Sequence, residues 1–262
     1  MFSIDFLHQI RAAEAEVILK RFPAGARVLE IGAGTGQQAQ EIRRRGFDIE
    51  AIEIPDSNYN QDRLFPITDY DGRHIPFPDA SFDVVFSSNV LEHVRALPVL
   101  HAEIQRVMRP GAICVHVLPT HAWRFWTMLA AFPCGVQKAL ALVTRPSPPV
   151  GSVFQRLRRV VVGFFMILGC LLAPFFQGRH GERGNILTEL WLFRPEVWRR
   201  NFRANGFQIV HDAPMGLHYT GYFVRGAAWS LARRAALART LGSACHLFEL
   251  KVAPPGGPRG GI

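Results

Sequence analysis

The sequence of 262 residues predicts an α/β fold with a doubly wound, mostly parallel sheet. An apolar run over 27–31 is followed by a glycine-rich loop, a helical pattern over 37–45 and a second apolar run over 47–54. The two apolar runs have the length of strands, and Gly46 is suited to end the helix between them. This stretch therefore predicts a β-α-β unit.

Further elements follow the same alternation. We expect a buried strand over 81–89, an amphipathic helix over 96–108, a turn at the Pro-Gly pair 110–111, and another strand from residue 112. Beyond residue 190, a helix that ends at a glycine and two more strands complete the pattern.

The alternation breaks between residues 120 and 190, where the chain is rich in Trp, Phe, Pro and Arg. We expect 121–190 to be an insertion between residues 1–120 and 191–253, which together form one domain. The final stretch, 254–262, consists mainly of glycine and proline and is expected to be a disordered tail.

The cysteines and the N-terminus favour a cytoplasmic protein. The four cysteines form no Cys-x-x-Cys pair, so we expect reduced core residues and no metal site; they are Cys114, Cys134, Cys170 and Cys245. The first 22 residues contain charges where a signal peptide requires an unbroken apolar stretch, so they predict an amphipathic helix.

The net charge of +9 is unevenly distributed along the chain. Residues 1–121 carry 12 Lys/Arg and 16 Asp/Glu, whereas residues 122–262 carry 18 Lys/Arg and 5 Asp/Glu. The basic half suits an anionic lipid surface, a nucleic acid or an acidic substrate, and it is also compatible with a solvated face.

The glycine loop indicates the charge of its ligand. A dinucleotide-binding loop has the order Gly-x-Gly-x-x-Gly, but here Gln37 stands at the position of the third glycine. Glu30, two residues before Gly32, would repel a pyrophosphate and attract an ammonium group. We therefore expect a nucleoside with a cationic tail, which the backbone approaches closely at the glycines.

The segment "VLEIGAGTG" resembles the first motif of the class I S-adenosylmethionine-dependent methyltransferases. The blocks "IPFPDASFDVV", "LEHV" and "RVMRPGA" extend the resemblance over about residues 25–120, and it continues more loosely over 190–252. The resemblance implies a Rossmann-like methyltransferase sheet, with 1–120 as its cofactor-binding half and a hydrophobic insertion after the fifth strand.

The same resemblance implies a binding site for S-adenosylmethionine. In the family, the glycine loop holds the methionine moiety, the acid that ends the second strand binds the ribose hydroxyls, the next residue lies against the adenine, and a further acid accepts from the adenine amino group. A carboxylate suits a vicinal diol, because it accepts two parallel hydrogen bonds. The matching residues are Glu30, Gly32, Ala33, Gly34 and Gly36 in the loop, Glu53 and Ile54 at the second strand, Asp71, and Ser88 and Asn89 near the methionyl end.

Methyl transfer requires alignment and exclusion of water more than a fixed set of catalytic groups. If the acceptor is a hydroxyl, a general base helps, and we favour His93 and His121 among the histidines and tyrosines near the expected site. His93 could instead hold the loop after its strand, and His121 could instead cap the insertion.

The insertion indicates where the acceptor comes from. Val160 to Phe176 carries no charge, and a helix of this length reaches only about 25 Å, less than the roughly 30 Å of a bilayer core. Ala122 to Val143 can supply a second arm, with Pro133, Pro174 and a linker at 145–152 allowing a bent hairpin. Arginines and tryptophans flank the apolar run, as at a lipid headgroup interface; they are Arg156, Arg158, Arg159, Arg179, Arg183, Trp123, Trp126 and Trp191.

We therefore expect an S-adenosylmethionine-dependent methyltransferase that acts on a hydrophobic, lipid-like small molecule at the inner face of the membrane. The alternative is a soluble acceptor, with the insertion forming a lid or a dimer interface.

Other classes of protein fit less well. Glu30 and Gln37 disfavour a dinucleotide-dependent oxidoreductase. A nucleic-acid methyltransferase is disfavoured because the arginines cluster around apolar residues and no Asn-Pro-Pro-Tyr-type block follows the strand over 81–89, so we expect no nucleic-acid partner. A catalytically silent, membrane-associated protein that binds the cofactor stays open, since a fold does not decide an activity.

Overall fold

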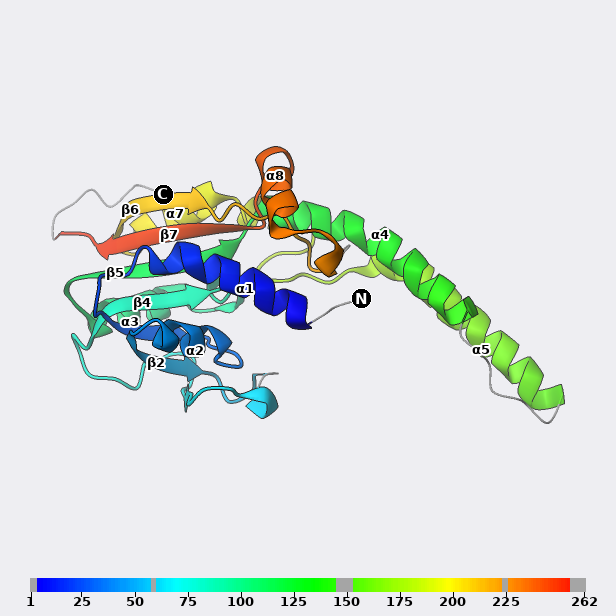
Figure 1. The fold of residues 1–262 in the computed structure, drawn as a ribbon, viewed down its shortest axis with the longest axis horizontal. Coiled ribbons are helices and arrows are strands. Elements are labelled where there is room, and N and C mark those ends of the chain that lie inside the picture. Colours follow the sequence, from blue (N-terminus) through cyan, green and yellow to red (C-terminus); the bar gives the residue numbers. More distant parts are fainter. Residues whose placement is uncertain (1–3, 58–59, 145–152, 223–225, 255–262) are drawn as a thin grey trace.

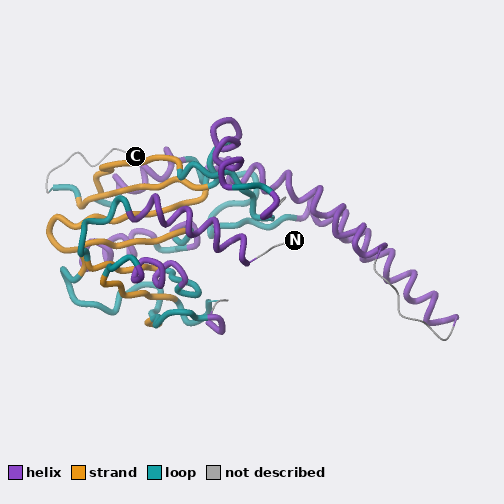
Figure 2. Tube along the Cα trace, viewed as in Figure 1, coloured by secondary structure: helices purple, strands orange, loops and turns teal. Residues whose placement is uncertain are grey.

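The computed structural model describes residues 4–57, 60–144, 153–222 and 226–254. Its centre is a seven-stranded sheet in the order β3-β2-β1-β4-β5-β7-β6 (Figures 1 and 2). All neighbours are parallel except β7, which runs antiparallel to both β5 and β6. The strands are β1 (Arg27–Ile31), β2 (Asp48–Glu53), β3 (Thr68–Asp69), β4 (Phe82–Ser88), β5 (Met108–Pro119), β6 (Phe207–Pro214) and β7 (Cys245–Val252).

Helices cover both faces of the sheet, as the doubly wound pattern predicts. Alternate residues of each strand point to opposite faces, so Val28 packs in one apolar core and Leu29 in the other. The first core includes residues of α1 (Ile4–Leu19) and α2 (Gln37–Arg44), and the second includes residues of α3 (Leu97–Val107) and α7 (Pro195–Ala204). The predicted β-α-β unit, the N-terminal amphipathic helix and the α/β class are therefore confirmed.

The predicted turn at Pro110-Gly111 is wrong. β5 begins directly after α3, and its pairing with β4 moves from Phe82–Met108 to Val84–Ile113. Pro110 and Gly111 are exposed and lie at this irregularity within the strand. A proline is tolerated there because its missing N–H does not interrupt a regular ladder.

Between β5 and α7 the chain forms a helical arm, which we define as α4 (His121–Thr144), α5 (Val153–Leu172) and the 3-10 helix η3 (Ala173–Phe176). The arm extends away from the sheet, and its two long helices lie side by side as an antiparallel hairpin (Figure 1). A Cβ atom at Gly135 would meet the carbonyl oxygen of Cys170 at 2.4 Å, so a glycine is required for this close helix contact. The linker at 145–152 and residues 255–262 of the expected tail lie outside the described residues.

The arm exposes a large apolar surface. On α4 the exposed apolar positions recur every three or four residues and therefore lie on one face of the helix. The exposed large apolar residues of the arm are Phe125, Leu129, Phe132, Val136, Leu140, Leu157, Val160, Val161, Val162, Phe164, Phe165, Met166, Leu168, Leu171, Leu172, Phe175 and Phe176. Neither α4 nor α5 contains an acidic residue.

Among the described residues, one helical stretch, His121–Leu142, is long and apolar enough to cross a membrane, with a mean hydropathy of 1.2. Val160–Phe176 is apolar but shorter. Two of the tryptophans expected at lipid headgroups instead contact protein: the Trp126 indole donates to the carbonyl of Leu241, and Trp123 packs against His180. Trp191 is exposed.

The base of the arm is joined to the sheet domain by a buried ion pair. Nε of Arg124 on α4 lies 2.8 Å from Oε2 of Glu189, the first residue of α6 (Glu189–Leu192), and both side chains are almost completely buried. The other carboxylate oxygen of Glu189 accepts from the backbone amides of His180 and Gly181, at 2.6 and 2.7 Å. One carboxylate therefore fixes both the arm and the segment that follows it. The remaining long helix, α8 (Leu231–Leu241), precedes β7.

We predict that Glu189→Ala lowers the free energy of unfolding by about 3–5 kcal/mol, because it leaves the Arg124 guanidinium buried without its counter-charge. Urea unfolding measures this loss. Glu196→Ala removes an exposed carboxylate that pairs with Arg199, and it should cost less than about 1 kcal/mol. Equal losses in the two variants would show that the buried pair has no special role.

Candidate functional site

The glycine loop lies between β1 and α2, at the carboxyl edge of the parallel strands. The backbone amides of Gly32 and Ala33 donate to the carbonyl of Ile52, which anchors the loop to β2. Gly32, Gly34 and Gly36 all have positive φ, and a Cβ atom at Gly32 would meet the Val90 side chain at 2.4 Å. The loop therefore needs glycine both for its conformation and for its close contact with the chain after β4.

Glu53 ends β2 and faces this loop. Its carboxylate accepts from the backbone amides of Gly34 and Ile54, both at 2.8 Å. The carboxylate group is therefore held in place, and each oxygen retains a further lone pair for a ligand hydroxyl. Ile54, the next residue along the chain, is exposed.

Glu30 lies on β1 and is buried, with 2% of its surface exposed. Burial raises the pKa of Glu30 from 4.5 to about 8. A hydrogen bond from the Ala39 backbone amide lowers this pKa, and the nearby charge of Glu53 raises it further. Its Oε2 has no hydrogen-bond partner among the described residues. A cation bound next to Glu30 would stabilise the ionised form.

Asp71 follows β3 and is exposed. Its carboxylate accepts hydrogen bonds from the backbone amides of Arg73 and His74, and it lies 2.8 Å from the His74 ring. These hydrogen bonds hold the pKa of Asp71 well below its usual range, and the bond from the His74 amide has the largest effect. A Cβ atom at Gly72 would be 3.5 Å from Ile54, so the turn after Asp71 borders the expected adenine position.

Ser88 and Asn89 lie at the end of β4, where they contact a residue that the sequence analysis missed. The Arg11 guanidinium of α1 donates to the Ser88 hydroxyl at 3.3 Å, and with its amide reversed Asn89 accepts from the same guanidinium at 2.9 Å. Asn89 has a positive φ of 55°, which turns the chain sharply away from the strand.

Arg11 belongs to a polar cluster at the centre of the site. Its guanidinium lies 2.8 Å from Glu14 Oε2, and the other oxygen of Glu14 accepts from the Tyr219 hydroxyl at 2.7 Å. The Tyr219 hydroxyl also contacts the Cys245 thiol at 3.1 Å. Burial raises the pKa of both Tyr219 and Cys245, so these two groups stay neutral at physiological pH. The sequence of α1 carries a hint of this cluster, because the charged residues Arg11 and Glu14 stand among the apolar positions that become buried.

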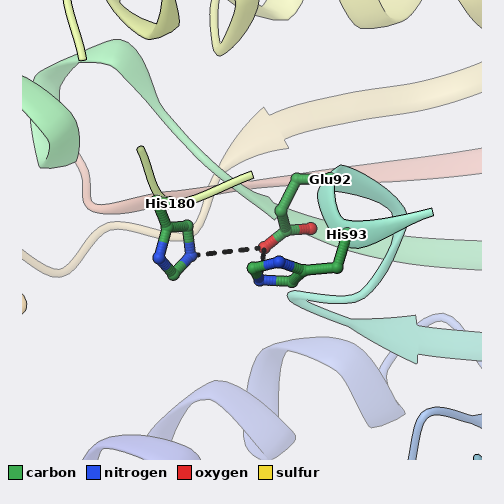
Figure 3. Close-up of side chains that lie close together, drawn as sticks. All are labelled: Glu92, His93 and His180. Atoms are coloured by element: carbon green, nitrogen blue, oxygen red, sulfur yellow. Dashed lines mark ion pairs between the residues drawn. The ribbon is translucent and has the colours of Figure 1, made fainter. Parts of the chain in front are cut away.

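His93 lies in the 3-10 helix η2 (Leu91–His93) and forms a second cluster with Glu92 and His180 (Figure 3). Nε2 of each histidine lies 3.8 Å from Oε1 of Glu92, and the two rings meet edge to face. Burial raises the pKa of Glu92 to about 8 and lowers that of His180 to about 4. This cluster was not predicted from the sequence, where the absence of a Cys-x-x-Cys pair led us to expect no metal site.

His121 has different surroundings. It begins α4, is exposed, and donates its backbone amide to the carbonyl of Phe193. Burial lowers the pKa of its ring, and the charges that act on it come from Arg194 and Glu196. The two candidate bases, His93 and His121, therefore belong to different groups of side chains in the structure.

A small, partly open cavity adjoins the second cluster. Its walls are mainly apolar and include Leu97, Phe193 and Trp198, while Glu92 and Arg183 supply charged groups. It offers room for an apolar group next to the end of β4.

The order of the sheet, the glycine loop after β1 and the carboxylate that ends β2 define the class I methyltransferase fold. Residues 6–212 match the methyltransferase domain family, and the chain belongs to it. S-adenosylmethionine is the cofactor of this class. This result confirms the family that the sequence motifs suggested.

One solved structure and two proteins related in sequence resemble this chain. A solved S-adenosylmethionine-dependent methyltransferase from Mesorhizobium loti shares the fold, with a TM-score of 0.51 and 16% identity over 91% of this chain and 97% of that chain. An uncharacterised methyltransferase of Mycobacterium sp. (strain KMS) is 38% identical over 100 residues, which cover 36% of this chain and 38% of that protein. A sterol 24-C-methyltransferase of Schizosaccharomyces pombe is 32% identical over 100 residues, covering 34% of this chain and 26% of that protein.

The raised pKa of Glu30 predicts a pH-dependent effect of Glu30→Gln. The wild-type carboxyl contributes stability fully below pH 4.5 and loses this contribution as the pH rises to about 8, because the fold favours the protonated form. The variant should therefore gain about 3 kcal/mol relative to the wild type between pH 5 and pH 8. Urea unfolding of the cofactor-free protein at several pH values measures this gain. A constant difference between the two proteins across this range would contradict the prediction.

Proposed function

We propose that the chain transfers a methyl group from S-adenosylmethionine to a hydrophobic, lipid-like small molecule at a membrane surface. The observation that supports the methyl-transfer step is the fixed carboxylate of Glu53, which faces the glycine loop across the ends of β1 and β2. The bound cofactor supplies an activated methyl group on a sulfonium.

The residues of the expected cofactor site have separate roles in this proposal. Glu53 binds the ribose hydroxyls, Ile54 lies against the adenine, and Asp71 accepts from the adenine amino group. Glu30 is the buried counter-charge for the cationic methionyl end, and the backbone of Gly32, Ala33, Gly34 and Gly36 permits close approach. Ser88 and Asn89 border the reacting end, where Arg11 holds their polar groups in place.

The chain's contribution to the reaction is mainly alignment and exclusion of water. With the cofactor bound, the acceptor atom would form a bond to the methyl carbon as the carbon–sulfur bond breaks, and the electron pair of that bond would stay on sulfur. If the acceptor is a hydroxyl, His93 is the better placed of the two candidate bases, because it lies two residues beyond Leu91, which lines the apolar cavity. His121 lies at the base of the arm.

The helical arm supports a lipid-like acceptor. Its exposed apolar side chains form a surface far larger than scattered exposed residues on a soluble domain, and the arm extends away from the sheet without covering the site (Figure 1). Contact with the inner face of a membrane would cover this surface, and Arg158 on α5 adds attraction to anionic headgroups. The name of the sterol methyltransferase relative is consistent with an apolar acceptor.

We predict that Glu53→Ala weakens binding of S-adenosylmethionine about 100-fold, because the variant loses two charge-assisted hydrogen bonds to the ribose and the support of the loop. Isothermal titration calorimetry measures the affinity. Glu50→Ala is the matched control on the same strand, since its carboxylate faces Arg27, and it should bind normally. Normal binding by Glu53→Ala would exclude the proposed role of Glu53.

We also predict that label from methyl-labelled S-adenosylmethionine, incubated with the protein and a total cell extract, enters the organic phase. The label should disappear with Glu53→Ala and persist with Glu50→Ala. Label confined to the aqueous phase would replace the lipid-like acceptor by a soluble metabolite. Absence of transfer despite normal cofactor binding would favour a catalytically silent protein.

Membrane contact is tested by flotation with liposomes that contain anionic lipid. Replacing Phe164 and Phe165 by serine should lower the partition coefficient for liposomes by about 100-fold or more, because two buried phenylalanines together contribute about 3–6 kcal/mol. The control replaces two exposed valines of the sheet domain, Val99 and Val210, by serine and should float normally. Wild-type protein that does not float would contradict the proposed membrane contact.

A further inference from the structure

We propose that Glu92, His93 and His180 form a binding site for a divalent transition-metal ion, such as Zn²⁺, Co²⁺, Fe²⁺ or Mn²⁺. The three possible ligand atoms lie within 4.8 Å of one another (Figure 3). Two imidazoles and one carboxylate, without a thiolate, suit ions of intermediate softness better than Mg²⁺ or Ca²⁺.

The carboxylate of Glu92 is the strongest sign of a missing cation. Its side chain is 0% exposed, and neither of its oxygens has a hydrogen-bond partner among the described residues. The ionised form of a carboxyl group in this condition is destabilised by several kcal/mol, so the group keeps its proton unless a positive charge replaces it. Arg11 is the cation whose charge acts on Glu92, but its hydrogen bonds go to Glu14 and Ser88.

The distances are close to those of a metal site. Nε2 of His93 and Nε2 of His180 each lie 3.8 Å from Glu92 Oε1, too far for a hydrogen bond. Bonds of about 2.1 Å in a tetrahedral arrangement place ligand atoms about 3.4 Å apart. Binding therefore requires each histidine to move by about 0.4 Å towards the carboxylate. The three ligand atoms, which lie within 4.8 Å of one another, must also close to this spacing.

The segment that carries His180 is fixed in position by the backbone. The amides of His180 and Gly181 donate to Glu189, and the amide of Glu182 donates to the carbonyl of Glu92 at 2.9 Å. A Cβ atom at Gly181 would also meet that carbonyl at 2.9 Å, so the two segments are in close contact. The site is thus largely formed before an ion arrives, and the Trp123 ring covers the His180 ring.

Three protein ligands leave coordination positions open for water or for an oxygen of a bound molecule. The apolar cavity begins at Glu92, so an acceptor that enters it would place a polar group near the ion. This use of the ion rests on the proposed function, and with the ion bound His93 would be a ligand and not the general base. Binding of the ion itself does not depend on the proposed function.

The test is a titration of chelator-treated protein with Co²⁺, followed by its visible absorption, and then competition with Zn²⁺. We expect one ion per chain in the wild type and a loss of affinity of about 100-fold or more in His180→Ala, because a direct ligand is removed. Glu92→Gln, which keeps the shape of the side chain, should also lose the ion. His74→Ala removes an exposed histidine that contacts only Asp71 among the described hydrogen bonds, and it should bind normally.

Thermal unfolding of the same samples shows whether each variant is folded. A wild type that binds no Co²⁺ or Zn²⁺, or a folded His180→Ala variant that binds as tightly as His74→Ala, would overturn the proposal. Titration with S-adenosylmethionine in the absence of metal tests the methyltransferase site separately, so the failure of one site can be distinguished from the failure of the other.

Discussion

The strand order of the sheet reverses between β1 and β4, and the rest of the site depends on this arrangement. Because β1 is hydrogen-bonded to both β2 and β4, the loops after these three strands meet at one edge of the sheet. Val90 fills the space above Gly32, and Glu53 holds the amide of Gly34. A side chain at Gly32 would separate the chain after β4 from the glycine loop, and the two halves of the site would no longer be adjacent.

Glu189 fixes the cluster of Glu92, His93 and His180 in a similar way. It neutralises Arg124 at the base of the arm and also accepts hydrogen bonds from the backbone amides of His180 and Gly181. As a result, the segment that returns from the arm is fixed against η2, and His180 is held beside Glu92. A chain that needed only to close the sheet would not require a buried ion pair here, since such pairs rarely increase stability over apolar packing. Precise placement of the return segment is a sufficient reason for it.

The parts of the structure that were predicted correctly depend on signals close together in the sequence. Strand, glycine loop, helix and strand follow one another over 27–54, so the loop and the carboxylate of Glu53 could be assigned without tertiary information. Pro110-Gly111 was assigned wrongly, because a local turn signal cannot show that a bulge in β5 accommodates both residues. The contact between Tyr219 and Glu14 and that between His180 and Glu92 join distant segments, and nothing in the sequence specified these pairs.

The origin of the arm links the apolar surface to the site. α4 begins two residues after β5 ends, and β5 is parallel to β4, so the arm leaves the sheet at the same edge as the glycine loop. A membrane in contact with the arm would therefore lie on the side of the molecule where an acceptor enters.

If the arm contacts a membrane as proposed, its charges favour an orientation along the membrane surface. Although α4 is about 36 Å long and could cross a bilayer, α5 begins at the far end of the arm with three arginines within residues 153–159. Carrying these charges through the hydrocarbon core is costly, whereas an arm that lies in the interface lets them reach the headgroups. In that orientation both helices would bury apolar side chains in lipid while the sheet domain stayed in water, and the proposed hydrophobic acceptor would reach the carboxyl edge of the sheet from the bilayer.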